Sequence, residues 1–317
     1  MSQKGDVVTL DTLIEGRKSE LCSHLVAKLS DDDVRDVLSR LGIERLQRKA
    51  FEIERHYKSV DNNWSQVTYQ LLLRYLLGSH NKKMVEKLTA KLHHNILLRE
   101  SHTLVNLEAL VLGCAGLLEL YAEDEYILRL KQEFQHLATK YNLSSLNASG
   151  WRLTGIHLNN HPTLRLVQFA ACLHQNRLNI RSFIDCKNNK DVVNLLACET
   201  SDYWVEKVAM YSKESKPARK IGYTVSNILA INAIAPLLYT YSNYIESQIL
   251  YDKALEMLYN LTPEDNLYTR QWQSEKQIAH CAFDTQALIQ LSTEYCKRGL
   301  CNECPLAQRL ISRNVEL

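Results

Sequence analysis

The sequence contains few of the residues that form turns. Only 10 of its 317 residues are glycine and 5 are proline. A β-sandwich or a doubly wound α/β fold of this length needs many turn residues between its elements, so the shortage argues against both. We expect an all-α protein, a multi-helix globular array built either as one large domain or as two packed helical lobes.

The sequence also lacks a large excess of charge of either sign. Its 38 lysines and arginines nearly balance 36 aspartates and glutamates, giving a formal net charge of +2. No strong overall field therefore indicates a nucleic-acid or membrane partner, although local basic clusters are compatible with one. Hydrophobic residues make up 45% of the chain, which is typical of a folded globular protein and argues against disorder.

Signals for secretion or membrane insertion are missing as well. The start of the sequence is mostly polar, unlike a secretory leader. Two apolar stretches, 104–121 and 225–239, are interrupted by polar residues and are shorter than the roughly 20 residues of a membrane span, so we expect buried helices there. Most of the nine cysteines stand alone in apolar helical surroundings, as Cys114 and Cys172 do, which is typical of reduced thiols. We expect a cytoplasmic protein without a membrane partner.

Helical periodicity and end signals divide the chain into segments. Ser30, followed by three aspartates, is typical of a helix start, because a hydroxyl caps the first amides and carboxylates suit the positive end of the helix dipole. Gly42 is expected to bend or split this helix. Asparagine, serine and glycine gather at 142–161, which indicates an irregular connection. The expected order is a short N-terminal extension (1–29), an N-terminal helical lobe (30–145), an irregular connector (146–161), a C-terminal helical lobe (162–295), and a cysteine turn with a final helix (296–317).

The most specific chemical motif is a cysteine turn near the C-terminus. Cys296, Cys301 and Cys304 are spaced so that a tight turn can bring three thiols to one ion. Structural zinc sites and iron–sulfur clusters usually take four protein ligands, and Cys281, one helix upstream, is the natural candidate for the fourth. We expect zinc or an iron–sulfur cluster with a structural role, since metal binding would stabilise this short terminal segment. The alternative is three reduced cysteines in a surface turn.

Signatures of familiar enzymes are absent. The sequence has no phosphate-binding glycine loop, no nucleophile elbow and no convincing pair of catalytic carboxylates. His157 and His161 have the spacing of a metal-binding helix, but their surroundings indicate a loop without the glutamate that a zinc protease needs. A stand-alone enzyme would require a pocket that unites groups such as His157, His161, Asp284 and Tyr203.

Local basic clusters leave nucleic-acid binding open. Lysine and arginine gather at 45–49, 82–91 and 213–220, with tyrosines elsewhere that could stack on bases. Acidic residues are interleaved with these clusters, and solvated helix faces have the same composition. The clusters therefore predict either phosphate-contacting surfaces or ordinary exposed faces.

Several segments form a recognisable series along the chain: 62–69, 106–113, 161–168, 203–204, 220–222, 227–236, 283–290 and the cysteine turn. In this order they resemble a known bacterial family, the domain of unknown function family 2851. The resemblance implies little about activity, because the family has no assigned function. Members are longer at the N-terminus, where the extra region resembles a nuclease fold. The resemblance implies that this chain corresponds to the helical C-terminal part, with an extended remnant of the junction at 7–10.

Three hypotheses for function follow from the motifs and the resemblance. The leading one is a helical accessory or binding module associated with nucleic acid through a nuclease-like protein partner, with Arg165 and Lys220 as candidate phosphate contacts. The second is a protein–protein interaction scaffold without affinity for nucleic acid. The third and weakest is a stand-alone enzyme of unknown class. The sequence predicts no particular oligomeric state.

Overall fold

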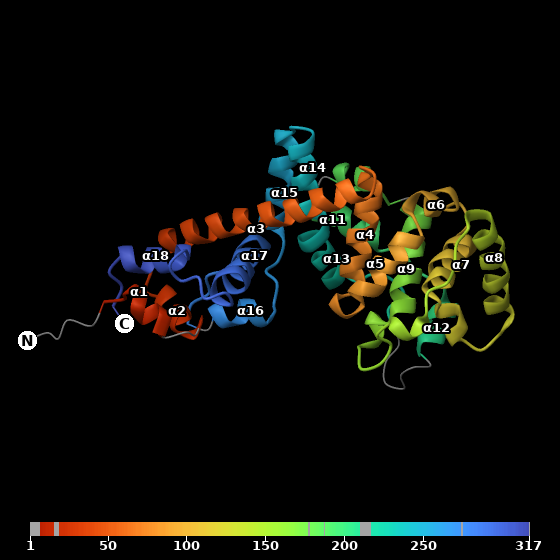
Figure 1. Cartoon of the computed structure of the whole chain (residues 1–317), viewed down its shortest axis with the longest axis horizontal. Coiled ribbons are helices and arrows are strands. Elements are labelled where there is room, and N and C mark those ends of the chain that lie inside the picture. The colour runs from red at the N-terminus through yellow and green to blue at the C-terminus, as the bar shows by residue number, and fades with distance from the viewer. Residues whose placement is uncertain are drawn as a thin grey trace, which may run out of the picture. The chain divides into compact units, whose positions relative to one another are not determined.

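The computed structural model describes residues 7–15, 19–176, 178–186, 188–209, 217–273 and 275–316. Every regular element in these ranges is a helix, so the prediction of an all-α fold is confirmed (Figure 1). The extended piece expected at 7–10 is shorter than predicted, because Val7 forms an isolated antiparallel bridge with Glu316 and Leu10 already begins α1. Beside it, the Val8 amide donates a hydrogen bond of 2.8 Å to the Val315 carbonyl.

The chain forms two compact units whose boundaries differ from the expected lobes. Unit 1 comprises Met1–Glu52 and Tyr239–Leu317, and unit 2 comprises Ile53–Leu238. Unit 1 is thus assembled from both ends of the chain, while the expected connector, 146–161, lies inside unit 2. Periodicity along the sequence reports which helix faces are apolar, but it does not report that the first helices pack on the last ones.

Unit 1 has a core shared by its N-terminal and C-terminal helices. Val34 and Leu38 lie in one apolar cluster with Leu288 and Leu306. The buried indole of Trp272 belongs to the same cluster, and its N–H donates a 2.7 Å hydrogen bond to Ser292 Oγ. The elements of unit 1 are α1 (Leu10–Glu15), α2 (Ser19–Val26), α3 (Asp31–Ser59, which continues into unit 2), α15 (Gln248–Asn260), α16 (Leu267–Arg270), η6 (Gln271–Gln273), α17 (Ala282–Gln290), the π-helix η7 (Leu291–Cys296) and α18 (Pro305–Ser312).

Helix α3 begins where the sequence predicts. Ser30 Oγ accepts a hydrogen bond of 3.2 Å from the Asp33 amide, which caps the first turn. The expected bend or break at Gly42 does not occur, because α3 is one continuous helix. Gly42 instead allows α3 to lie directly against α17: a Cβ atom there would fall 2.4 Å from the ring of Phe283.

Unit 2 is built around a helix that is buried on every side. All residues of α7 from 107 to 115 are buried, and Figure 1 shows this helix between α8 and α9. The buried helix expected within 104–121 is therefore confirmed, and no helix in the described part of the chain is long and apolar enough to cross a membrane. The elements of unit 2 are α4 (Trp64–Leu76), η1 (Ser79–Asn81), α5 (Lys82–Lys91), α6 (His94–Arg99), α7 (Leu104–Ala115), η2 (Leu117–Leu120), α8 (Glu125–Tyr141), η3 (Ala148–Gly150), η4 (Leu158–Asn160), α9 (Pro162–Asn176), α10 (Ile180–Ile184), α11 (Asn189–Leu196), α12 (Asp202–Ala209), α13 (Tyr223–Leu229), the π-helix η5 (Ala230–Ile234) and the start of α14 (Ala235–Tyr244).

Candidate functional site

Arg165, a candidate phosphate contact, lies inside unit 2. Its side chain projects from α9 and the residue is only 3% exposed, so burial lowers the pKa of its guanidinium to about 10. Two hydrogen bonds hold the guanidinium, one of 3.0 Å to Gln168 Oε1 and one of 3.1 Å to Asn160 Oδ1. In turn, Gln168 donates a bond of 2.8 Å to the carbonyl of Ala218. Arg165 therefore helps to hold this part of the fold together and is not presented on the surface.

Lys220, the other candidate, is exposed just before α13. The backbone two residues earlier is fixed at Ala218, whose amide donates a bond of 2.8 Å to Asn159 Oδ1. This contact and the one from Gln168 anchor the segment that carries Lys220. Lys220 is therefore exposed to solvent, whereas Arg165 is buried.

The residues that an enzyme would need to bring together have separate structural partners. His157 is exposed and its ring accepts a bond of 3.2 Å from the Asn159 amide, whereas His161 is buried, which lowers its pKa to about 4. Tyr203 donates to the carboxylate of Asp124 at 3.0 Å. In unit 1, Asp284 accepts a bond of 2.8 Å from the His280 amide at the start of α17. None of these contacts forms a base–nucleophile pair.

A buried carboxylate that sequence reasoning overlooked lies at the centre of unit 2. Glu108 on α7 is 0% exposed, and its Oε2 accepts a 2.6 Å bond from the Trp204 indole and a 2.8 Å bond from the Tyr126 hydroxyl. Burial raises the pKa of Glu108 to about 7, although both hydrogen bonds act in the opposite direction. The only sequence signal was one acidic residue within an otherwise apolar run.

The pKa of a second carboxylate in unit 2, that of Asp124, is shifted in the opposite direction. Asp124 accepts hydrogen bonds from Lys207 at 2.5 Å and from the Ile127 amide at 2.9 Å, and these contacts lower its pKa to about 2. The ring of Tyr203, which also donates to Asp124, lies 5.1 Å from that of Trp204. Together the two carboxylates fasten α12 to α7 and α8.

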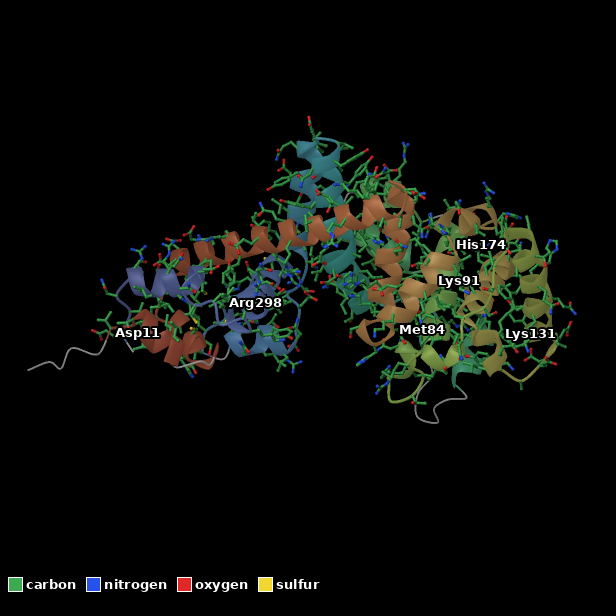
Figure 2. The ribbon with its side chains drawn as sticks, viewed as in Figure 1. Asp11, Met84, Lys91, Lys131, His174 and Arg298 are labelled. Carbon is green, nitrogen blue, oxygen red and sulfur yellow. The ribbon has the colours of Figure 1, made fainter. Side chains whose placement is uncertain are left out.

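The basic cluster predicted at 82–91 forms one exposed face of α5. We call it the lysine face; it consists of Lys82, Lys83, Lys87 and Lys91, all of which are exposed. Within α5 the only acid is Glu86, 3.9 Å from Lys82. Figure 2 marks Lys91, the last residue of α5, and Met84, a buried residue in the first turn of the helix.

Arg152 extends this basic surface at the N-terminal end of α5. It is exposed, and its amide donates a bond of 2.8 Å to Asn81 Oδ1, directly before the helix. At the other end, Lys91 Nζ donates to Ser144 Oγ at 2.6 Å. The lysine face is therefore an ordered concentration of positive charge on a protein that is nearly neutral overall.

The C-terminal cysteines form the tight turn that the sequence predicts. The Gly299 amide donates to the Cys296 carbonyl and the Cys304 amide to the Cys301 carbonyl, each at 3.2 Å. Gly299 has a φ of +68°, which favours glycine. Cys304 then caps α18, and the Leu306 and Ala307 amides act on its thiol so as to lower its pKa, against the larger effect of burial.

Cys281, the expected fourth ligand, lies apart from this turn. It caps α17, and Cys296 is the last residue of η7, which continues directly from α17. A helical run of this length separates its two ends by about 20 Å, far beyond the span of one metal site. The groups that act on the pKa of the Cys281 thiol include Asp284, within the first turn of α17.

Cys22 of α2 lies beside the turn instead. Burial raises the pKa of Cys22 to about 12, and the neighbouring Cys304 and Cys301 contribute in the same direction. Burial likewise raises the pKa of Cys296 to about 12, with contributions from Cys304, Cys22 and Cys301. Among the described residues, no three His, Cys, Asp or Glu side chains already stand in a metal-ligand arrangement.

Comparison with known proteins identifies the family. A family model described as a protein of unknown function (DUF2851) matches residues 4–267. The chain belongs to this family. The DUF2851 match includes Cys22, Glu108, Arg165 and the lysine face, and it ends before the cysteine turn. No curated protein and no solved structure matches the chain.

Proposed function

We propose that this DUF2851 chain is a non-catalytic helical module that associates with nucleic acid through the lysine face. The observation that carries the proposal is that four lysines share the exposed side of α5 with a single acid. Lysines on one face contact successive phosphates and release counterions, which gives binding that depends on salt and little on sequence. Arg152 and Lys220 supply further phosphate contacts, whereas Arg165 acts only by holding neighbouring backbone in place.

The test is a comparison of two matched double variants in unit 2. Lys83→Gln with Lys87→Gln removes two charges from the lysine face, and Lys58→Gln with Lys190→Gln removes two exposed charges elsewhere. Fluorescence anisotropy would follow binding to single-stranded DNA, duplex DNA and RNA over a series of salt concentrations. We expect the first variant to bind several-fold more weakly and to lower the slope of log K against log salt by about 2, with a smaller effect in the control. No binding at low salt, or equal losses in both variants, would contradict the proposal.

The cysteine turn serves this module as a structural clamp. In the proposal, the thiolates of Cys296, Cys301 and Cys304 bind zinc or an iron–sulfur cluster. A centre closed by thiolates has no open position for substrate, so its contribution is to the stability of the C-terminal segment.

A second candidate function, a protein–protein scaffold, is favoured by one apolar surface in unit 1. Tyr244, Ile245 and Ile249, between the end of α14 and the start of α15, are 59%, 44% and 80% exposed. Exposed apolar side chains grouped in this way are typical of an interaction site. Light scattering on the wild type and on Ile249→Asp would test self-association, and co-purification would test capture of a nuclease-like partner. Association lost in the variant, with no affinity for nucleic acid, would favour the scaffold.

A further inference from the structure

Four cysteines from the two ends of the chain gather in unit 1. Cys22 on α2 and Cys296 at the end of η7 pack against the same apolar cluster, and Cys304 belongs to that cluster. Cys301 lies three residues before Cys304, within the turn, and α2 also contacts α18. All four are free thiols. The grouping therefore joins α2 to a turn near the C-terminus of the chain.

Four thiols that lie close together can act as ligands of one metal cation. Burial is the main cause that raises the pKa values of Cys22 and Cys296, and the neighbouring thiols act on both in the same direction, as expected of sulfurs that lie near one another. A bound metal cation reverses this effect, because it attracts all four sulfurs at once. Cys304 also lies directly before α18, at the N-terminal end of the helix that contacts α2.

The spacing of the cysteines matches known thiolate sites. Cys296, Cys301 and Cys304 follow the Cys-x4-Cys-x2-Cys pattern that plant-type ferredoxins combine with a fourth, distant cysteine. Structural zinc sites also take four thiolates, commonly in pairs separated by two to four residues. Both centres use the same ligand chemistry, four deprotonated sulfurs.

We propose that Cys22, Cys296, Cys301 and Cys304 together bind one metal centre, with Cys22 as the fourth ligand in place of Cys281. The inference rests on the metal binding proposed above for the turn and adds the ligand that completes it. Each thiol releases its proton to solvent as its sulfur binds, so four protons leave for each zinc ion taken up.

The test uses the full chain purified without oxygen, with zinc, iron and inorganic sulfide measured alongside the visible spectrum. We expect either one zinc per chain or a brown protein with iron and sulfide. Cys22→Ser and Cys301→Ser should each lose the metal, whereas the matched control Cys281→Ser should retain it. A metal-free wild type would overturn both this inference and the proposed clamp. A Cys22→Ser variant with full metal content would overturn the inference alone.

A second measurement does not depend on whether the variants fold. Alkylation of the native wild type, read by mass spectrometry, should leave Cys22, Cys296, Cys301 and Cys304 protected together and label all four after the metal is removed. Labelling of Cys281 should be the same before and after removal. Labelling of Cys22 in the metal-bound protein, or a disulfide between Cys22 and Cys304, would overturn the assignment.

Discussion

The indole N–H of Trp204 donates a hydrogen bond of 2.6 Å to Glu108 Oε2, and both residues are 0% exposed. This bond joins α12 to the buried helix α7. It fixes a carboxylate where ionisation is unfavourable, so the stability of unit 2 depends on the charge of one side chain. Two predictions follow from this geometry.

Replacing Glu108 by glutamine should remove a pH-dependent loss of stability. The folded pKa of about 7 lies above the ordinary value of 4.5, so the folded state holds its proton more tightly than the unfolded state does. Stability from this group is present below about pH 4.5 and is lost as pH rises to about 7. The wild type should therefore lose about 3 kcal/mol relative to Glu108→Gln between pH 4.5 and 8. Denaturant unfolding of both proteins at each pH measures the difference.

The wild type must be compared with Glu108→Gln at each pH, because two buried histidines change the stability of both proteins with pH in the opposite direction. Burial lowers the pKa values of His94 and His161 to about 4, so their effect favours the folded state increasingly as pH rises to about 6.5. Both variants share these histidines, and the difference cancels them. A difference that is constant from pH 4.5 to 8 would show that Glu108 does not titrate in this range.

Replacing Trp204 by phenylalanine should destabilise unit 2 by about 1–3 kcal/mol, more at pH 8 than at pH 5. The variant removes a donor from a carboxylate that ionises near pH 7, and a bond to a charged acceptor is the stronger one. Trp151→Phe is the matched control, since that indole donates a 2.9 Å bond to the neutral carbonyl of Ala115. Thermal unfolding at the two pH values measures both; an equal pH dependence in the control would contradict the assignment.

Gly42→Ala should destabilise unit 1 by about 1–3 kcal/mol, because its Cβ would overlap the ring of Phe283. Shortening the ring with Phe283→Leu should recover part of the loss in the double variant. Gly222→Ala is a suitable control, since its Cβ would meet no atom within 4 Å and its φ is −79°. Chemical denaturation of the wild type, the two single variants, the double variant and the control tests this contact, and strictly additive effects of Gly42→Ala and Phe283→Leu would argue against it.

Asp33→Asn should loosen α18. Asp33 at the start of α3 accepts hydrogen bonds from Arg309 at 2.9 Å and Arg313 at 2.7 Å, and the bond from Arg313 is the largest cause that lowers its pKa. Faster amide exchange is therefore expected in Pro305–Ser312, and in the wild type the same loosening should develop as acid protonates Asp33. Asp32→Asn, which affects an exposed pair with Arg35, should leave α18 unchanged.

The sequence was sufficient for the fold class but not for the arrangement of the helices. Scarcity of turn residues predicted the helices, and Ser30 marked the start of α3, because both are local properties. Gly42 was read as a local weakness, although its function is contact with Phe283 far along the chain. Non-local packing of this kind leaves no periodic signal.

The candidate sites show the same division between local and distant information. The turn of Cys296, Cys301 and Cys304 was predicted from its spacing, whereas Cys22 stands alone in the sequence near the opposite end of the chain. Arg165 was singled out for its charge, yet the structure uses that charge internally. The sequence identifies a cationic side chain, but only the packing shows whether that side chain is buried or exposed.

The division of unit 1 between the two ends of the chain has a consequence for biosynthesis. As the ribosome makes the protein, α1, α2 and the first part of α3 emerge long before α17 and α18, which complete their core. The contiguous residues of unit 2 can fold in the meantime, while the apolar faces of α1, α2 and α3 are not yet covered by α17 and α18. The nascent chain thus exposes these apolar faces until α17 and α18 have been made, and chaperones can bind the faces during that time.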